Sequence, residues 1–430
     1  MDIPGGAAGP STSDVVAPSP RRARRTLAVL TLVNLLNYID RSIVPAIAAS
    51  LGASALHLNN KEIGLLGTGF ILVYAVASPW FGSLGDRRHR PRLIALGVAI
   101  WSVATVLGGF AVSMLTLFAA RAILGIGEAA YGSIAPSLLA DSFPRRVRGR
   151  VFSIFFAAIF VGTALGYIIA GQMTAHFGWR SAFFVAGAPG LVLAVLLLRL
   201  PEVPRGAQDD DPVAADRGGA GQIAAYAGLL RNAQYRITVL GYAAYTFAFG
   251  ALAFWFPKFL VAFHGMAEKT ADNLVGGIVV VTGFAGTFGG GWIGDAALRW
   301  RKHGYLLVSG IETLLAVPFC VLALTAHSSW LFLGSLVVAL LLLCASTGPI
   351  NSAIVNYVAP TQRATAMALS ILAIHVLGDA PSPAIVGTVA DLGTGGGLSP
   401  GVAMQHGLLL LPAAIFIGGV VWTIGGLRRE

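Results

Sequence analysis

Two adjacent residues of opposite charge, Asp40 and Arg41, lie inside a long apolar run between Thr26 and Leu51. An ionised side chain at mid-bilayer depth costs roughly 2.5–3.5 kcal/mol on insertion scales, so it persists mainly where it faces a partner or a wet cavity. A membrane helix that carries this pair therefore predicts a functional site. The rest of the chain must supply the groups that lie opposite the pair.

The first partners occur in another apolar run, where Arg121 and Glu128 are seven residues apart. Seven residues return to nearly the same helix face, about 10 Å further along the axis. Gly125 and Gly127 lie between them and allow a neighbouring helix or a substrate to approach. Protonating an acid here would release an arginine for an anionic substrate, whereas a permanent lock between two helices is the alternative. The residues that we expect to form one buried, formally neutral cluster are Asp40, Arg41, Arg121 and Glu128.

A second group combines His375 and Asp379, which are four residues apart and share a helix face. Pro381 and Pro383 break the helix just beyond them, which frees carbonyl groups that a cavity must satisfy. Because histidine titrates near physiological pH, we expect His375 and Asp379 to take part in proton coupling. A structural His–Asp contact at a kink is the alternative. No metal site is expected, because no further ligand set is evident.

A Gly-x-x-Gly-Asp pattern ends one apolar run at Asp86 and recurs at Asp295. Gly82 permits close helix contact, and Asp86 can meet a basic residue or a helix N-terminus across an interface. We interpret the pattern as a conformational latch, because ordinary anchoring by positive loops explains the arginines but not the glycine and aspartate. The expected gating residues are Gly82, Asp86, Arg87, Arg90 and Asp295.

An aromatic stretch without charge runs from Phe247 through Phe254 to Phe256. Together with the charged cluster, it predicts a cavity that is polar on one side and apolar on the other, which suits an anionic amphiphile. Simple packing or lipid contact of these rings is an equally good alternative. The residues expected to contact the substrate are Tyr38, Arg41, Arg121, Tyr131, Phe247 and Phe254.

The composition sets the class of protein. Of 430 residues, 56% are hydrophobic and only 11% are charged, with a mean hydropathy of +0.76, whereas soluble domains carry about 25% charged residues. The chain is therefore a multi-pass membrane protein. A net charge of +10 would suit a nucleic-acid-binding protein, but the basic residues form short clusters between apolar runs. Cys320 and Cys344 lie inside apolar runs and indicate neither a disulfide framework nor a metal site.

A bilayer core of about 30 Å needs about 20 apolar residues in helix. The candidate spans are 26–51, 63–84, 92–113, 115–140, 149–172, 182–200, 236–262, 273–295, 305–326, 330–357, 364–392 and 406–427. Arginine clusters follow alternate spans, so both termini are expected in the cytoplasm. We expect a disordered tail at 1–25, a six-helix half at 26–200, a cytoplasmic linker at 201–235, and a second six-helix half with a short tail at 236–430.

With these motifs together, the chain resembles the Spinster family of the major facilitator superfamily. The strings that carry the resemblance are Asn37-Tyr38-Ile39-Asp40-Arg41, Gly82 to Arg90, Arg121 to Tyr131 continuing to Ala135-Pro136, Arg148-x-Arg150, and His375-xx-Gly378-Asp379-xx-Ser382-Pro383. The resemblance implies the major facilitator fold, with a substrate site between two pseudo-symmetric halves. It also implies proton-linked transport of lysophospholipid or sphingosine 1-phosphate, with Asp40 and Glu128 responding to protons, Arg41 and Arg121 governing the head group, and His375 assisting.

We therefore expect an alternating-access transporter and not an enzyme, without a cofactor, monomeric, in a bacterial inner membrane. Its expected partners are protons, the lipid bilayer and an anionic amphiphilic lipid, with no nucleic acid. An exporter of a small organic anion or drug is the alternative within the same fold. A membrane-embedded lipid-modifying enzyme is a remote one, because it would need a complete nucleophile–base pair or metal set.

Overall fold

The computed structural model describes residues 19–428 except 48–49, 52–53, 55, 57, 59, 210–221 and 267. Within these residues the chain is helical, and twelve segments are long and apolar enough to cross a membrane. The first half contains α1 (Pro20–Ala46), α3 (Asn60–Arg87), α4 (Arg90–Gly109), α5 (Met114–Ser142), α6 (Arg148–Phe177) and α7 (Trp179–Leu198). The second half contains α9 (Ala233–His264), α10 (Glu268–Leu298), α11 (Gly304–Thr325), α12 (Ser329–Ala345), α13 (Thr347–Asn356), α14 (Arg363–Ile374), α15 (Ser382–Gly395), α16 (Pro400–Leu408) and α17 (Leu410–Leu427).

The twelve predicted spans are confirmed, and the main differences concern the segments around them. Residues 20–25, predicted to be disordered, are helical because α1 begins at Pro20. The Ser19 hydroxyl accepts a hydrogen bond from the Arg22 amide, and proline suits the first helical position. Residues 1–18 of the predicted tail lie outside the described residues. The predicted linker contains a short helix, α8 (Gln222–Arg231).

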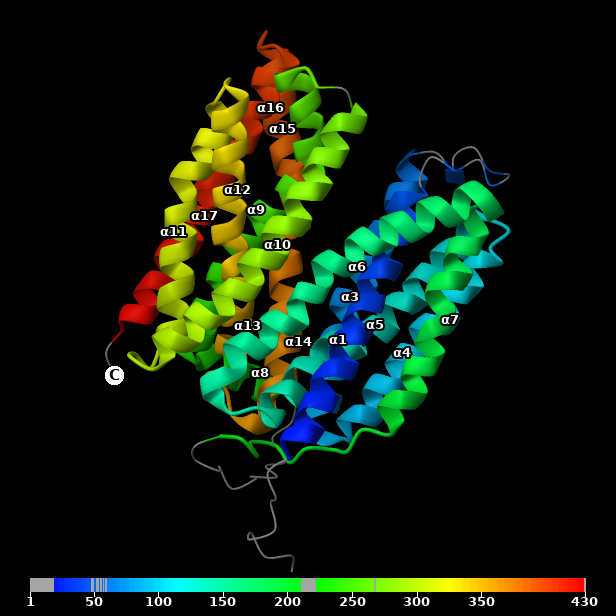
Figure 1. The fold of residues 1–430 in the computed structure, drawn as a ribbon, viewed down its shortest axis with the longest axis vertical. Coiled ribbons are helices and arrows are strands. Elements are labelled where there is room, and N and C mark those ends of the chain that lie inside the picture. The colour runs from blue at the N-terminus through cyan, green and yellow to red at the C-terminus, as the bar shows by residue number, and fades with distance from the viewer. Residues whose placement is uncertain are drawn as a thin grey trace, which may run out of the picture.

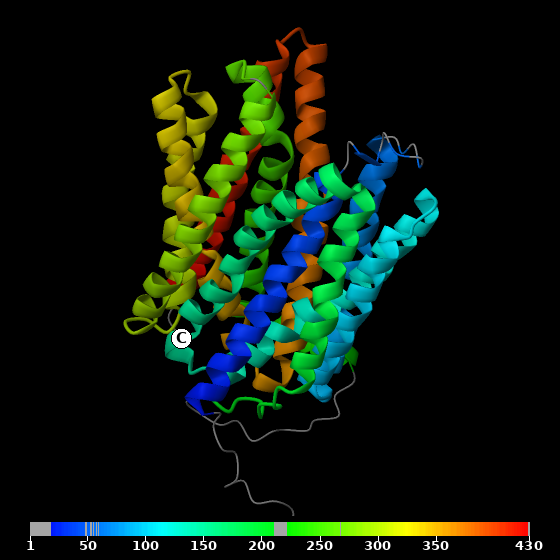
Figure 2. The ribbon, with the colours of Figure 1, turned by 45° about the vertical axis from the view of Figure 1, so that its right-hand side comes forward.

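The halves lie side by side, blue to green for the first and green to red for the second (Figure 1). We call the end of the bundle where α1 begins and α17 ends the terminal face. There α6 packs against α10, and α3 against α14. Toward the opposite face the two halves diverge, as Figures 1 and 2 both show. The halves are thus closed together at the terminal face.

The eleventh span is interrupted at its middle, as the two prolines predict. A short 3-10 turn, η3 (Pro360–Gln362), leads into α14, and a π-helical turn, η4 (His375–Asp379), separates α14 from α15. Such π turns occur frequently at functional sites. A Cβ atom at Gly250 of α9 would lie 2.5 Å from the Asp379 Cβ, so glycine is needed for this close approach. The break therefore presents His375 and Asp379 beside α9.

Candidate substrate and proton-coupling site

The predicted charged cluster forms in the first half as two ion pairs. In the first pair, Arg41 Nε of α1 donates to Glu128 Oε2 of α5 over 2.7 Å. Glu128 is fully buried, whereas 22% of the Arg41 side chain is exposed. The other carboxylate oxygen, Oε1, is buried and has no hydrogen-bond partner. Arg41 is therefore held by one buried acid while part of its surface stays accessible.

The second pair joins Arg121 of α5 to Asp40 of α1. The distance between Arg121 Nη1 and Asp40 Oδ1 is 3.6 Å, longer than a hydrogen bond, and both side chains are buried. The Thr105 hydroxyl of α4 donates to the other carboxylate oxygen of Asp40. Asp40 Oδ1 and the Nε and Nη1 atoms of Arg121 have no hydrogen-bond partner. The sequence did not point to Thr105, since a threonine in an apolar span carries no distinctive signal.

Three aromatic rings surround the Arg41 guanidinium. Its central carbon lies 5.1 Å from the ring centre of Tyr38, 5.0 Å from that of Phe70 and 4.8 Å from that of Tyr74. Arg121 shares the Phe70 ring, also at 5.0 Å. Cations on aromatic faces are stabilised by about 0.5–2 kcal/mol. Tyr38 was predicted at the site, whereas Phe70 and Tyr74 of α3 were missed although they share a helix face four residues apart.

Tyr74 connects the cluster to the second half. Its ring meets His375 edge to face, with centres 5.6 Å apart. His375 Nδ1 lies 3.0 Å from both carboxylate oxygens of Asp379. Both side chains of this pair are partly exposed. A continuous series of contacts thus runs from Glu128 through Arg41 and Tyr74 to the His375–Asp379 pair. It crosses from α3 of the first half to the break after α14 in the second half.

Three predicted substrate contacts lie differently from the expectation. Tyr131 is buried, and its hydroxyl donates to the Leu30 carbonyl over 2.8 Å, so its ring belongs to the packing of the first half. Phe254 is 63% exposed, and Phe247 is half-buried on a nearby part of the α9 surface. Helical spacing alone could not say which side of α9 faces the molecule's interior.

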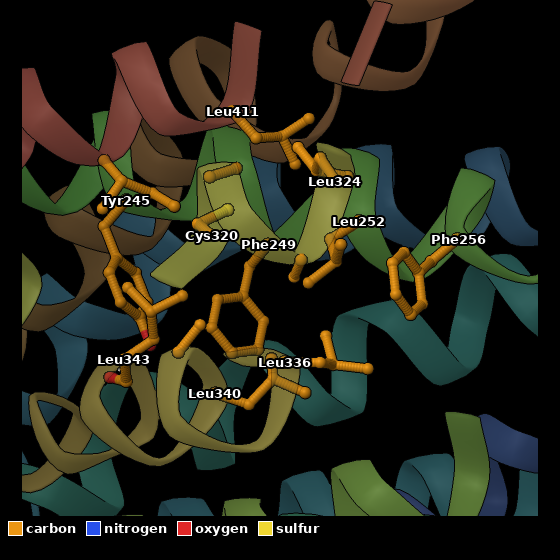
Figure 3. Close-up of a pocket in the computed structure, with 14 residues that line it drawn as sticks. Tyr245, Phe249, Leu252, Phe256, Cys320, Leu324, Leu336, Leu340, Leu343 and Leu411 are labelled. Carbon is orange, nitrogen blue, oxygen red and sulfur yellow. Dashed lines mark hydrogen bonds between the residues drawn. The ribbon is translucent and has the colours of Figure 1, made fainter. Parts of the chain in front are cut away.

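An apolar cavity borders the opposite side of α9 (Figure 3). Phe249, Leu252 and Phe256 of α9 line it, together with Leu336 and Leu340 of α12. Its volume is about 20 Å³, close to the 10–15 Å³ at which a cavity admits a single water. In this conformation the cavity is too small for a lipid chain.

The two aspartates of the predicted latch, Asp86 and Asp295, each contact a helix N-terminus of the opposite half at the terminal face. Asp86, which ends α3, accepts hydrogen bonds from the amides of Ala364 and Thr365 at the start of α14, over 3.0 and 2.8 Å. Asp295 of α10 accepts from the amides of Gly149 and Arg150 at the start of α6, over 2.8 and 3.2 Å. An anionic side chain at a helix N-terminus is stabilised by the exposed amides and the helix dipole. Each half therefore caps a helix of the other.

Arg90 is buried beside the latch, whereas Arg87 is exposed at the end of α3. Arg90 Nη1 donates to Asp141 Oδ2 of α5 over 2.5 Å, and Arg363 of the second half binds the other oxygen of Asp141. Asp141 was not predicted, because it lies one residue beyond the predicted span 115–140, whereas α5 continues to Ser142. Asp141 therefore holds one arginine from each half.

The predicted linker adds a second bridge between the halves. Asp209 accepts from Arg148 Nη2 over 2.7 Å and from Arg363 Nη2 over 2.8 and 2.6 Å. Arg148 opens α6 and Arg363 opens α14, so one linker carboxylate joins both halves. Burial alone would raise the pKa of Asp209, but the guanidinium groups of Arg363 and Arg148 hold this pKa below its usual value. The terminal face is thus closed by ionised groups from three parts of the chain.

A fold of two packed six-helix halves with buried ion pairs inside the first half is typical of membrane transporters, and residues 30–383 match the model of the Major Facilitator Superfamily. "Protein spinster homolog 3" of Mus musculus is 32% identical over 98% of this chain and 86% of the relative. "Probable sphingolipid transporter spinster homolog 1" of Arabidopsis thaliana is 28% identical over 93% and 88%.

Among solved structures, a bacterial homologue of the human lysosomal transporter Spinster, in an inward-facing and occupied conformation, has the same fold. Its TM-score is 0.63 at 23% identity, covering 95% of this chain and 97% of that one. The chain belongs to the Spinster family of the major facilitator superfamily. It is a multi-pass membrane transporter rather than an enzyme.

Proposed function

We propose that this protein moves an anionic amphiphile across a bacterial inner membrane by alternating access, coupled to proton movement. The observation that carries the proposal is the pairing of the partly exposed Arg41 with the buried Glu128. A guanidinium is a natural partner for a phosphate head group, and here Glu128 already holds it. Substrate and carboxylate would therefore compete for the same cation.

Protonation of Glu128 resolves this competition. A neutral carboxyl no longer attracts Arg41, so the guanidinium is free for the head group. Coupling of this kind is reciprocal, since a proton that favours the anion is itself favoured by the anion. Asp40 and Arg121 form the neighbouring pair, and we propose that they respond to the same charge changes through the shared Phe70 ring. We assign His375 and Asp379 to proton transfer from the second half, through contact with Tyr74.

The closed terminal face supports a direction for this state. If the arginine clusters lie in the cytoplasm, as the positive-inside rule predicts, the conformation is closed to the cytoplasm and the halves diverge toward the outside (Figure 2). The latch residues Gly82, Asp86, Arg90 and Asp295 would then form the cytoplasmic gate. The change to the inward-facing state would require breaking the caps at α6 and α14.

The substrate class rests on the charged cluster and on relatives. One relative bears the name of a probable sphingolipid transporter, which favours sphingosine 1-phosphate or a lysophospholipid over other anions. A small organic anion or drug would meet the same arginine but would need no apolar contact. Binding competition between lysophospholipid and a short-chain phosphate ester separates the two candidates, because only an amphiphile site discriminates by chain length.

The test is transport in proteoliposomes with an imposed pH gradient. We expect the gradient to drive flux of sphingosine 1-phosphate or lysophospholipid by wild type. With Glu128→Gln we expect the gradient-driven component to disappear, while exchange of substrate between the two sides continues. Glu312→Gln, which replaces a buried acid of α11 in the other half, is the matched control and should keep gradient-driven flux. Gradient-driven flux at wild-type rate in Glu128→Gln would refute the assignment of Glu128.

A further inference from the structure

A second pocket lies on the terminal face, between the two halves and away from the central site. Its volume is about 220 Å³. A cavity of about 10–15 Å³, measured in the same way, already admits one water molecule. The pocket is many times larger, so a phosphate group fits in it. The residues that line it are Arg145, Arg146, Asp295, Leu298, Arg299 and Lys302. Arg145 and Arg146 come from the 3-10 turn η2 (Arg145–Val147) of the first half, and the others from the end of α10 and the turn that follows.

The acid in the pocket is already neutralised. Asp295 accepts hydrogen bonds from Arg150 Nε over 2.9 Å and from the Tyr305 hydroxyl over 2.8 Å, in addition to the two amides that open α6. Its charge is therefore satisfied by Arg150, which does not line the pocket. The remaining ionisable lining groups are four cations, so the pocket favours an anion.

The pseudo-symmetry of the halves explains the excess of cations. Arg90 and Arg299 each follow a latch aspartate by four residues. Arg90 is paired with Asp141, which also holds Arg363. The group that occupies the corresponding place in the second half is Asn356, whose Oδ1 accepts from Arg148 Nη1 over 2.5 Å. An amide replaces the acid there, so Arg299 lacks the counter-charge that Arg90 has.

Two of the four cations, Arg146 and Arg299, have no counter-charge in the part of the chain that the structure describes. No carboxylate forms an ion pair with Arg146 or Arg299 there, and both side chains are exposed. The buried Nε atom of Arg145 has no hydrogen-bond partner. At Arg146 and Arg299 the pocket therefore offers two cations that have no carboxylate partner among the described residues.

The neighbouring tryptophan indicates the depth of the pocket. Trp300, directly after Arg299 in the turn between α10 and α11, is 88% exposed. Tryptophan is enriched at the membrane–water interface, where its ring lies among the lipid head groups. From the exposed Trp300 we infer that the pocket lies at the level of the lipid phosphates.

We propose that this pocket binds the phosphate group of an anionic phospholipid. Because Arg145 and Arg146 belong to one half and Arg299 and Lys302 to the other, the site is complete only while the terminal face is closed. A ligand that binds one conformation better shifts the population toward it. The bound phosphate therefore stabilises the closed terminal face. This consequence rests on the proposed alternating access, but the binding of the phosphate does not.

The experiment is native mass spectrometry of the full chain released from phosphatidylglycerol or phosphatidylcholine nanodiscs. We expect wild type to retain phosphatidylglycerol. Arg146→Ala/Arg299→Ala should weaken retention roughly thirtyfold, since each cation near anionic lipid contributes about fivefold. Arg301→Ala is the matched control, because it removes a charge from the same turn without lining the pocket. Equal retention by wild type and the double variant would overturn the proposal.

Two further arms keep the test independent of folding defects and of transport. Asn356→Asp removes no cation but restores the acid that the first half has, so it should also reduce retention; undiminished retention would contradict the symmetry argument.

Inorganic phosphate added at millimolar concentration shows whether the bound phosphate group comes from a lipid or from solution. Displacement of the lipid would assign the pocket to soluble phosphate, and persistence of the lipid would assign it to the head group. Failure of lipid transport in liposomes would leave these binding results unchanged.

Discussion

Glu128 and Arg41 form an ion pair in which the carboxylate occupies the guanidinium that we propose for the substrate head group. Their 2.7 Å contact is charge-assisted, and hydrogen bonds to charged groups contribute about 1.5–3 kcal/mol. Glu128→Gln removes the negative charge that holds Arg41, so we expect sphingosine 1-phosphate to bind this variant tighter than wild type by roughly tenfold or more. Isothermal titration calorimetry of the purified proteins with this lipid measures both affinities. Equal affinities of wild type and Glu128→Gln would mean that Glu128 does not compete with the head group for Arg41.

At this scale the sequence predicts charged groups well and neutral ones poorly. Asp40 and Arg121 could be placed in one charged cluster in advance, because each would be costly alone in an apolar helix, but which acid pairs with which arginine could not. Phe70, Tyr74 and Thr105 complete the site, yet nothing in their spans distinguishes them from ordinary packing residues. Their importance arises from the crossing of α3 and α4 with α1, which only the tertiary structure supplies.

At the scale of elements, the contact between α3 and α14 depends on a missing side chain. A Cβ atom at Gly82 would lie 2.4 Å from the Ala368 Cβ and 2.7 Å from the Ala364 carbonyl. We expect Gly82→Ala to separate the two helices, at roughly 1–3 kcal/mol for overpacking, and so to shift the halves five- to 150-fold toward opening at the terminal face. Spin-label distances between α3 and α14 measure the shift.

The control for this substitution is Gly289→Ala on α10, where a Cβ atom would meet nothing within 4 Å. Its spin-label distances should match those of wild type. If Gly82→Ala also leaves the distances unchanged, α3 and α14 tolerate a methyl group between them, and the close contact is not what closes the face.

The elements themselves were largely predictable, because a bilayer demands apolar runs of fixed length. The residues at which the helices begin and end were harder to predict. The arginines near the start of α1 look like a soluble tail, yet Ser19 and Pro20 begin the helix before them. The sequence also could not show which face of α9 points into the second half. Phe249 and Phe256 line the cavity there, whereas Phe254 is exposed. Aromatic residues recur on all sides of α9, so no apolar stripe selects one.

For the whole molecule, the linker decides how firmly the two halves close. Asp209 joins Arg148 of one half to Arg363 of the other, while Glu202 of the same segment binds Arg90 within the first half only. Asp209→Asn should therefore weaken closure by about 1–2 kcal/mol, after allowance for partial exposure, which corresponds to roughly a five- to thirtyfold shift. Glu202→Gln removes an equal charge and should shift the halves much less.

The pH dependence of this effect distinguishes the Asp209 bridge from the proposed proton-coupling site. A group whose pKa is lowered on folding stabilises the folded arrangement above its ordinary pKa and loses that contribution only as the pH falls through the lowered value. The pKa of Asp209 is lowered, so the carboxylate stays ionised throughout the neutral and mildly acidic range. A cysteine in place of Ser153, buried between the halves beside Gly291, should react with maleimide faster in Asp209→Asn, by the same factor at pH 6 and at pH 8. A factor that vanishes at pH 6 would mean that Asp209 itself titrates with the transport cycle.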